Sequence, residues 1–161
     1  MPSRSVIACA HNLLAKNLTI AFAESASTGK LVYDFTSVPN CGTVVKGSIV
    51  CYDRSVKEQL LGIPGEIIDK YTAESAEVTS LLAQATKKLI PADVVVAVTG
   101  LASEGGSESE EKPVGTMFVH GIIKDEEWKA QFLFDGTPDE IVAQTIDAIA
   151  TVLLEKISNI P

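Results

Sequence analysis

The stretch that decides the fold is DVVVAV, residues 93–98, in which four of the six residues are valine. β-Branched residues without a polar interruption predict a strand buried on both faces, and such a strand lies in the centre of a sheet. Shorter apolar runs at Thr19–Ala23 and Val45–Tyr52 predict two further strands. Two more runs, Val114–Ile123 and Trp128–Phe134, flank a short polar turn and predict an antiparallel hairpin.

Segments with helical periodicity alternate with these strands. Ser3 is the expected N-cap of the first helix, Thr72 that of a long central helix, and Thr137-Pro138-Asp139-Glu140 forms a capping box. The expected helices run from about Ser3 to Leu14, from near Ser27 to before Pro39, from about Ser55 to Leu61, from Thr72 to before Pro91, and from Pro138 toward the C-terminus. This alternation predicts one α/β domain over residues 1–161, built as a three-layer α/β/α sandwich with a mixed sheet.

The composition disfavours several classes of function. The 161 residues carry a net charge of −8, which disfavours binding to the phosphate backbone of a nucleic acid. The three cysteines, Cys9, Cys41 and Cys51, are too few for a disulfide framework or a thiolate zinc site. The only histidines are His11 and His120, so a catalytic metal site is not expected either. No stretch resembles a signal peptide or is long enough to cross a bilayer, so we expect a cytoplasmic protein without a metal or a membrane partner.

The segment AESASTGK, residues 23–30, lies where a buried strand is expected to turn into a helix. Ligands of open α/β sheets collect at the carboxyl ends of strands, and unpaired N–H groups at a helix start can hold an oxyanion. Ser25 is therefore a candidate nucleophile for acyl transfer, although simple N-capping by Ser and Thr is the alternative interpretation. A phosphate-binding P-loop is disfavoured, because Glu24 and Leu31 stand where the pattern requires Gly and then Ser or Thr.

A lysine follows at the next connection from strand to helix, in YDRSVK at residues 52–57. Partial burial of Lys57 against a serine would lower its pKa toward that of a useful base, and a Ser–Lys pair needs no histidine. A solvated surface lysine on a short helix is the alternative interpretation.

Small residues mark the two ends of the connection that follows the central strand. Gly100 and Gly115 would let a ligand or another backbone come close, and Thr99 and Thr116 could donate hydrogen bonds to such a ligand. A role in turns alone is an equally good interpretation. Between them, Ser103–Glu111 is rich in Glu, Ser and Gly and is expected to be a surface loop.

Taken together, the motifs resemble the C-terminal domain of the CinA competence/damage-inducible proteins, a family that includes stand-alone bacterial nicotinamide-nucleotide amidases. The resemblance covers about Leu18–Leu154. It rests on Tyr52 with Lys57 five residues later, and on the motifs Ala23-Glu24-Ser25, Thr36-Ser37-Val38-Pro39, Leu60-Leu61-Gly62, Ala97-Val98-Thr99-Gly100 and Lys112-Pro113-Val114-Gly115-Thr116.

The resemblance implies a nicotinamide-nucleotide amidohydrolase that converts nicotinamide mononucleotide to nicotinic acid mononucleotide and ammonia without a cofactor. It puts the catalytic Ser, Lys and Tyr on Ser25, Lys57 and Tyr52, with Tyr52 relaying or orienting the proton and with backbone N–H groups near Ala26–Thr28 holding the oxyanion. Relatives in the family are oligomers, so a homo-oligomer is expected. The expected substrate-binding residues are Glu24, Ala26, Ser27, Thr28, Gly29, Thr99, Gly100, Gly105, Gly106, Gly115 and Thr116.

Three features depart from the family's usual pattern. Ala26-Ser27-Thr28-Gly29 stands where the family usually has Cys-Thr-Gly-Gly, and Ser103-Glu104-Gly105-Gly106 replaces a Gly-Pro-Gly-Gly-type loop and adds negative charge. No arginine follows Arg54, although the family often carries arginines near the start of the last helix and within it. A relative that binds a nucleotide-like ligand or a partner protein, with weak or no turnover, is therefore the alternative to an amidase.

Overall fold

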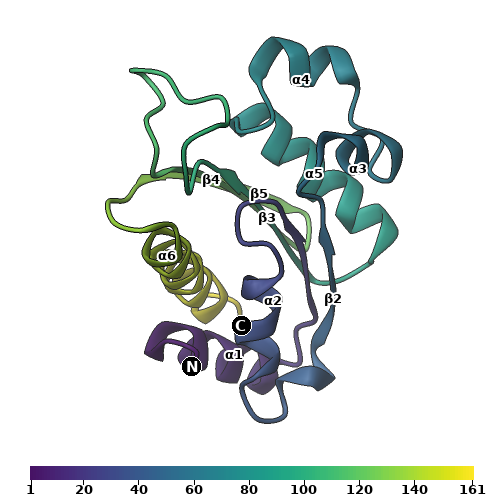
Figure 1. Ribbon diagram of the computed structural model, residues 1–161. Helices are drawn as coiled ribbons and strands as arrows, with labels where there is room; N and C mark the ends of the chain where they lie inside the picture. Colours follow the sequence, from purple (N-terminus) through teal and green to yellow (C-terminus); the bar gives the residue numbers. More distant parts are fainter.

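The computed structural model describes residues 1–161 and is organised around one five-stranded mixed sheet (Figure 1). The strand order is β2–β1–β3–β4–β5, with β1 parallel to both β2 and β3, and with β4 antiparallel to β3 and β5. The strands are β1 (Ile20–Glu24), β2 (Val45–Val50), β3 (Val94–Gly100), β4 (Thr116–Ile123) and β5 (Glu126–Leu133). The valine-rich run is therefore the central strand and the hairpin is antiparallel, as the sequence predicts.

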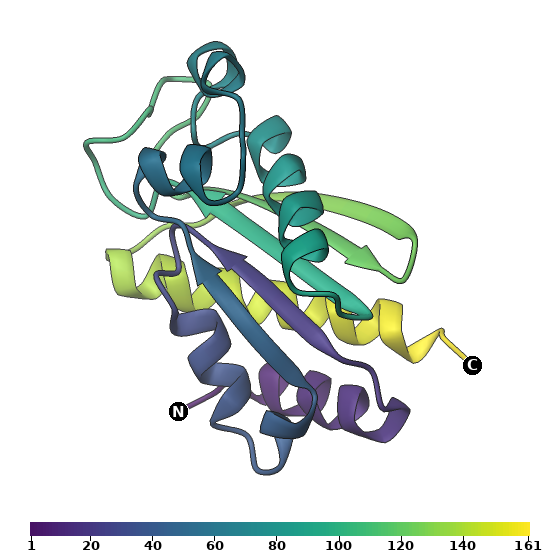
Figure 2. The same ribbon diagram turned by 90° about the vertical axis from the view of Figure 1, so that its right-hand side faces the viewer.

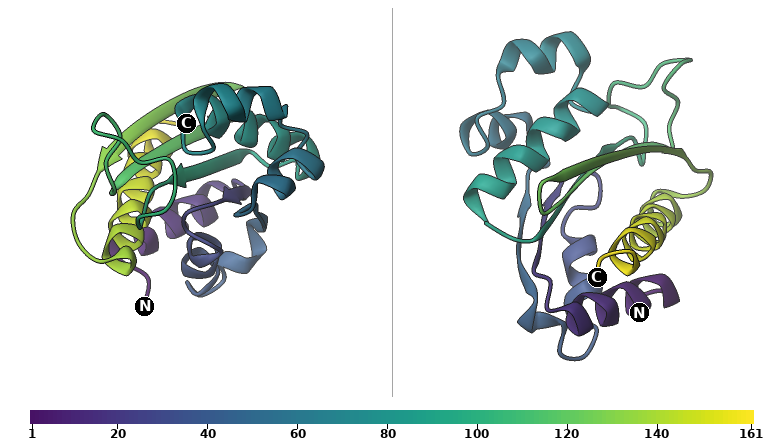
Figure 3. Two further views of the ribbon diagram at one scale, coloured as in Figure 1. Left: turned by 45° about the horizontal axis from the view of Figure 1, so that its top comes forward. Right: turned by 180° about the vertical axis from the view of Figure 1, so that it is seen from behind.

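Helices cover both faces of the sheet, which makes the fold a three-layer α/β/α sandwich (Figure 3). One face carries α1 (Arg4–Lys16), α2 (Lys30–Thr36) and α6 (Pro138–Ser158), with a short 3₁₀ turn, η1 (Cys41–Thr43), beside them. The other carries α3 (Arg54–Gln59), α4 (Gly65–Tyr71) and α5 (Ala76–Leu89). None of these helices is long and apolar enough to cross a membrane.

The core is two apolar clusters that the sheet separates. Successive side chains of a strand point to opposite faces, so Val94, Val96 and Val98 pack toward α1 and α6, while Val95 and Ala97 pack toward α5. The cluster on the α1 and α6 side holds 24 buried residues and the one on the α5 side holds 12. Burial on both faces explains why β3 has no polar residue before Thr99.

Several helix ends agree with the capping residues seen in the sequence. The Ser3 side chain accepts a hydrogen bond from the Val6 N–H at 3.2 Å, and the capping box between Thr137 and Glu140 is formed in full. Asp53 caps α3 by accepting from the Ser55 N–H at 2.8 Å. These interactions join residues two or three positions apart, which is why they can be read from the sequence alone.

Two boundaries differ from the expectation. Thr72 is not the N-cap of the long helix: its φ of 72° ends α4, a helix that the sequence pattern did not predict, and Ser75 caps α5 instead. α2 begins at Lys30 and not near Ser27, because Thr28 and Gly29 adopt left-handed φ angles of 47° and 94°. A loop of five residues, Ser25–Gly29, therefore separates β1 from α2.

Candidate active site

Ser25 sits at the carboxyl end of β1, where hydrogen bonds to both neighbouring strands hold the chain. The Ser25 N–H donates to the Val98 carbonyl at 3.0 Å, and the Cys51 N–H donates to the Glu24 carbonyl at 2.8 Å. The polypeptide on either side of the serine is thus tied to β3 and to the segment after β2. Such anchoring fixes the position of Oγ before any ligand arrives.

Lys57 reaches Ser25 from α3, on the connection that follows β2. Its side chain is only 2% exposed. Its Nζ lies 3.1 Å from Ser25 Oγ, 2.5 Å from the Cys51 carbonyl oxygen and 3.2 Å from the Tyr52 carbonyl oxygen. The structure therefore brings together the two residues that the sequence proposed as nucleophile and base, 32 positions apart.

The surroundings of Lys57 shift its protonation equilibrium toward the neutral amine. Burial lowers the pKa of Lys57, while the more weakly opposing effects of Cys51, Glu74 and Asp53 raise it. A neutral amine has two N–H groups and one lone pair. As an ammonium, Lys57 can donate to all three oxygens beside Nζ; as a neutral amine it would donate to the two carbonyl oxygens, and its lone pair would face the Ser25 hydroxyl. In that neutral form the amine has the geometry that a general base for the serine would need.

Tyr52 contacts the pair through its main chain. Its carbonyl accepts from Lys57, whereas its side chain is 69% exposed and forms no hydrogen bond with Ser25 or Lys57. The ring does line the hollow in front of the serine. A role for the hydroxyl in relaying or orienting the proton stays a prediction.

A cavity of about 380 Å³ opens in front of Ser25. It lies at the end of the sheet from which α4 and the connection between β3 and β4 project (Figure 2). Of the expected substrate-binding residues, five line this cavity: Ala26, Thr28, Gly100, Gly105 and Gly106.

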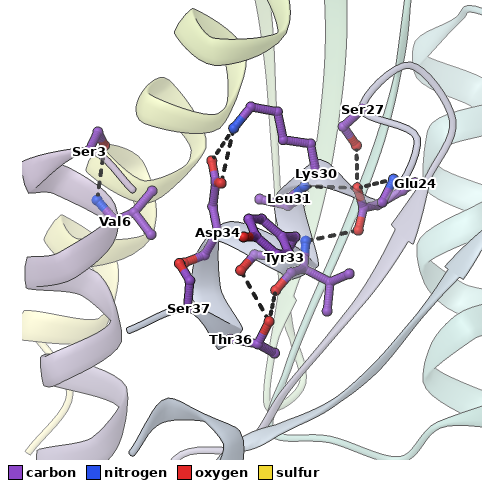
Figure 4. Close-up of polar contacts among 12 residues, drawn as sticks. Ser3, Val6, Glu24, Ser27, Lys30, Leu31, Tyr33, Asp34, Thr36 and Ser37 are labelled. Carbon is purple, nitrogen blue, oxygen red and sulfur yellow. Dashed lines mark hydrogen bonds and ion pairs between the residues drawn. The ribbon is translucent and has the colours of Figure 1, made fainter. Parts of the chain in front are cut away.

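Glu24, expected to bind substrate, is buried and does not line the cavity. The side chain is 0% exposed and points toward the start of α2 (Figure 4). Oε2 accepts from the Ser27 hydroxyl at 2.7 Å and from the Gly29 and Leu31 N–H groups at 3.0 Å each. Oε1 accepts from the Val32 N–H at 3.0 Å and the Ser48 hydroxyl at 2.9 Å. Glu24 is thus a buried cap that holds the loop after the nucleophile.

The same carboxylate removes two other residues from the expected substrate pocket. Ser27 is buried, and its hydroxyl donates a hydrogen bond to Glu24. Gly29 directly precedes α2, and its N–H donates to the same carboxylate. The positive φ of Gly29 lets the chain turn there. Neither residue lines the cavity.

Thr99, Gly115 and Thr116, also expected in the substrate pocket, do not line the cavity either. Thr99 is buried, and its hydroxyl lies 2.9 Å from that of Thr79 on α5. The Thr116 hydroxyl donates to the Pro113 carbonyl at 2.6 Å. Gly115 has a φ of 97°, and a Cβ there would lie 1.9 Å from the Phe134 carbonyl oxygen, so this glycine serves a close approach of two backbone segments.

Two main-chain N–H groups beside the nucleophile remain free. Those of Ala26 and Ser27 donate no hydrogen bond within the chain, and that of Thr28 donates only to the Ser25 carbonyl at 3.3 Å. Because Glu24 occupies the N–H groups of α2 itself, the candidate oxyanion donors lie in the loop and not in the helix.

The cavity also has a charged lining, of which the sequence indicated only Glu104. Glu74, from the turn before α5, and Asp139, from the first turn of α6, line it together with Glu104. No residue of the lining is Lys, Arg or His. No group of three or more His, Cys, Asp or Glu side chains is arranged to hold a metal ion.

Comparison with known proteins gives consistent matches. The profile of the family described as CinA C-terminal domain matches residues 4–157. A CinA-like protein of Petrotoga mobilis is 36% identical over 129 residues, which are 80% of this chain and 32% of that protein. One of Desulfotalea psychrophila is 31% identical over 149 residues, 90% of this chain and 36% of that protein. The chain thus spans about a third of the length of these curated relatives.

Solved structures match over nearly the whole chain. The crystal structure of a CinA superfamily protein from Klebsiella pneumoniae superposes with a TM-score of 0.90 and 21% identity, covering 97% of each chain. At this identity the likeness concerns the fold alone. It agrees with the mixed five-stranded sheet flanked by helices described above.

Proposed function

The chain belongs to the CinA C-terminal domain family, and from the geometry of Ser25 and Lys57 we propose that it is an amidohydrolase acting on a nicotinamide nucleotide. The observation that carries the proposal is the buried Lys57 amine, held by two carbonyl oxygens with its third contact on Ser25 Oγ, next to an open cavity. The carboxamide of nicotinamide mononucleotide is the substrate that the family resemblance implies.

The proposed reaction begins with acylation of the serine. Ser25 Oγ attacks the carboxamide carbon, and Lys57 accepts the hydroxyl proton as the new C–O bond forms. The free N–H groups of Ala26 and Ser27 donate to the oxyanion of the tetrahedral intermediate. Lys57 then returns the proton to the amide nitrogen, the C–N bond breaks, and ammonia leaves an acyl-enzyme.

Deacylation repeats these steps with water. Lys57 takes a proton from a water molecule that enters the cavity, and the resulting hydroxide adds to the acyl carbon. When the intermediate collapses, the C–O bond to Ser25 breaks, the proton returns to Oγ, and the carboxylic acid is released. Every proton in the cycle passes through one amine, so no histidine is needed.

The test is ammonia release from nicotinamide mononucleotide by the purified chain and its Ser25→Ala and Lys57→Met variants. Lys46→Met, at an exposed lysine on β2, is the matched control. We expect Ser25→Ala and Lys57→Met to lower kcat about a thousandfold or more, while the control keeps wild-type turnover. Wild-type turnover by Ser25→Ala would refute the proposal that Ser25 is the nucleophile.

A second function, ligand binding without turnover, is favoured by Thr28. This β-branched residue lines the cavity with a φ of 47°, a conformation that suits the glycine usual in the family. No ammonia release by the wild-type chain, with thermal protection by the nucleotide, would support the binding function over the amidase.

A further inference from the structure

The charges around the cavity argue against a phosphate on the ligand. Glu74 and Glu104, from two connections of the chain, and Asp139, from the first turn of α6, line the same cavity. A phosphate monoester carries up to two negative charges at neutral pH, and its binding sites supply Lys, Arg or free N–H groups. This lining supplies carboxylates and no cationic side chain, and the free N–H groups of Ala26 and Ser27 are those that the proposed reaction uses for its oxyanion.

Neither helix N-terminus near the cavity is available to an anion. At α2, the N–H groups of Gly29, Leu31 and Val32 already donate to the buried Glu24 carboxylate. At α6, Pro138 has no N–H, Asp139 places a carboxylate in the first turn, and Glu140 closes the capping box. The helix dipoles that attract phosphates in many α/β proteins are therefore already paired with the chain's own carboxylates.

Two lysines that contact lining residues of the cavity, Lys57 and Lys112, are also committed to hydrogen bonds within the protein. Lys57 lies behind Ser25 and contacts two carbonyl oxygens. Lys112 Nζ donates to the Thr72 hydroxyl at 2.6 Å, the Glu74 carbonyl at 2.8 Å and the Ser107 hydroxyl at 2.7 Å, so it ties the loop after β3 to the turn before α5. Its three N–H groups are used in these contacts.

We infer that the site takes a carboxamide that is cationic or neutral and carries no phosphate, of the class of an N-glycosylated pyridinium carboxamide. The inference rests on the proposed amidase chemistry at Ser25 and Lys57, and it replaces the nucleotide by the corresponding nucleoside as the preferred substrate. A pyridinium ring is a permanent cation, so the three carboxylates attract it, and the same carboxylates repel a phosphate attached to the sugar. The dephosphorylated nucleoside of nicotinamide satisfies both conditions, whereas its mononucleotide satisfies only the first.

The experiment compares these two compounds, which differ only in the phosphate. Ammonia release gives kcat/KM for nicotinamide riboside and for nicotinamide mononucleotide, and calorimetry gives their Kd for the Ser25→Ala variant. We expect the nucleoside to be favoured roughly tenfold or more in both measurements at low salt. The preference narrows as salt is added, because ions screen exposed charges.

A double variant, Glu104→Gln with Asp139→Asn, tests whether the carboxylates cause the preference. Both side chains are exposed, so the fold should tolerate the change, and Glu74 is left intact because it accepts a hydrogen bond from Ser107. Glu110→Gln with Glu155→Gln removes the same charge from exposed positions outside the cavity. The cavity variant should lose most of the preference for the nucleoside, and the matched control should keep it.

The outcomes separate this inference from the function on which it rests. Faster turnover of the mononucleotide, or a preference that the cavity variant leaves unchanged, would overturn the inference and leave the amidase standing. Selective binding of the nucleoside without ammonia release would uphold the ligand class and refute the amidase. If neither compound binds or is hydrolysed, both fail.

Discussion

The buried Glu24 carboxylate offers the sharpest test of how the nucleophile loop is held. Five donors converge on it: the Gly29, Leu31 and Val32 N–H groups and the Ser27 and Ser48 hydroxyls. In Glu24→Gln one oxygen becomes an NH₂ group. If this group takes the place of Oε2, it faces two main-chain N–H donors; in the place of Oε1 it faces one, and the Ser48 hydroxyl can rotate to accept.

The cheaper arrangement still leaves one buried N–H unsatisfied. It also removes the charge that strengthens the remaining hydrogen bonds. A hydrogen bond to a charged group contributes about 1.5–3 kcal/mol, and a buried unsatisfied donor costs about 1–3 kcal/mol. We therefore expect Glu24→Gln to lower the free energy of unfolding by about 3 kcal/mol. For a chain of this size that corresponds to a fall in Tm of roughly 6–12 °C.

The assay is urea unfolding followed by circular dichroism, with Glu77→Gln as the matched control. Glu77 is an exposed residue in the first turn of α5, where a carboxylate contributes only about 0.3–1 kcal/mol through the helix dipole. A loss below about 1 kcal/mol in Glu24→Gln, or one equal to that of the control, would refute the claim that this carboxylate organises the loop. An unchanged m-value is needed for the comparison to hold.

Three further predictions concern the dyad and two strained positions. Because burial lowers the pKa of Lys57, kcat/KM should rise with pH and level off below the ordinary lysine pKa of about 10.4. The free energy of unfolding should also rise with pH between the lowered pKa of Lys57 and that ordinary value. Urea unfolding at several pH values measures this rise, and Lys57→Met should abolish it. Thr28→Gly should raise Tm by about 1–3 °C in calorimetry by relieving the left-handed φ of 47°, and a fall would contradict the assignment of strain. Gly115→Ala should lower Tm by roughly 5–15 °C, because its Cβ would lie 1.9 Å from a carbonyl oxygen. Gly105→Ala, with a similar φ of 99° and open space around it, should lower Tm much less. Equal losses of Tm would mean that the effect comes from backbone strain and not from the clash.

The central strand and the helix caps could be predicted because their signals are local. The valines at positions 94–98 need only the alternation of faces along a strand, and the capping box at Thr137 joins residues three positions apart. The same locality caused the error at α4. That helix spans seven residues from Gly65 to Tyr71, too few for a helical period to stand out, so the sequence pattern places Thr72 at the start of the next helix.

The candidate site divides along the same line. The sequence motifs, a serine after a buried strand and a lysine five residues after Tyr52, were enough to predict that Ser25 and Lys57 lie together. In the structure Lys57 Nζ lies 3.1 Å from Ser25 Oγ. The positions of Glu24 and Thr99 could not be predicted, because a polar residue beside a nucleophile can face either the cavity or the core. Its partners decide between the two, and those of Glu24 and Thr99 include Ser48 and Thr79.

Periodicity, capping and charge composition, which depend on near neighbours in the chain, were enough to establish the α/β class, the central strand and the acidic character of the protein. Packing of distant segments decided the rest: the burial that lowers the pKa of Lys57, the carbonyls that hold its amine, and the meeting of Glu74, Glu104 and Asp139 on one cavity. Desolvation and electrostatic fields sum over all groups that surround an atom in space, whatever their separation in the chain. For that reason the base and the charge of the pocket belong to the folded molecule.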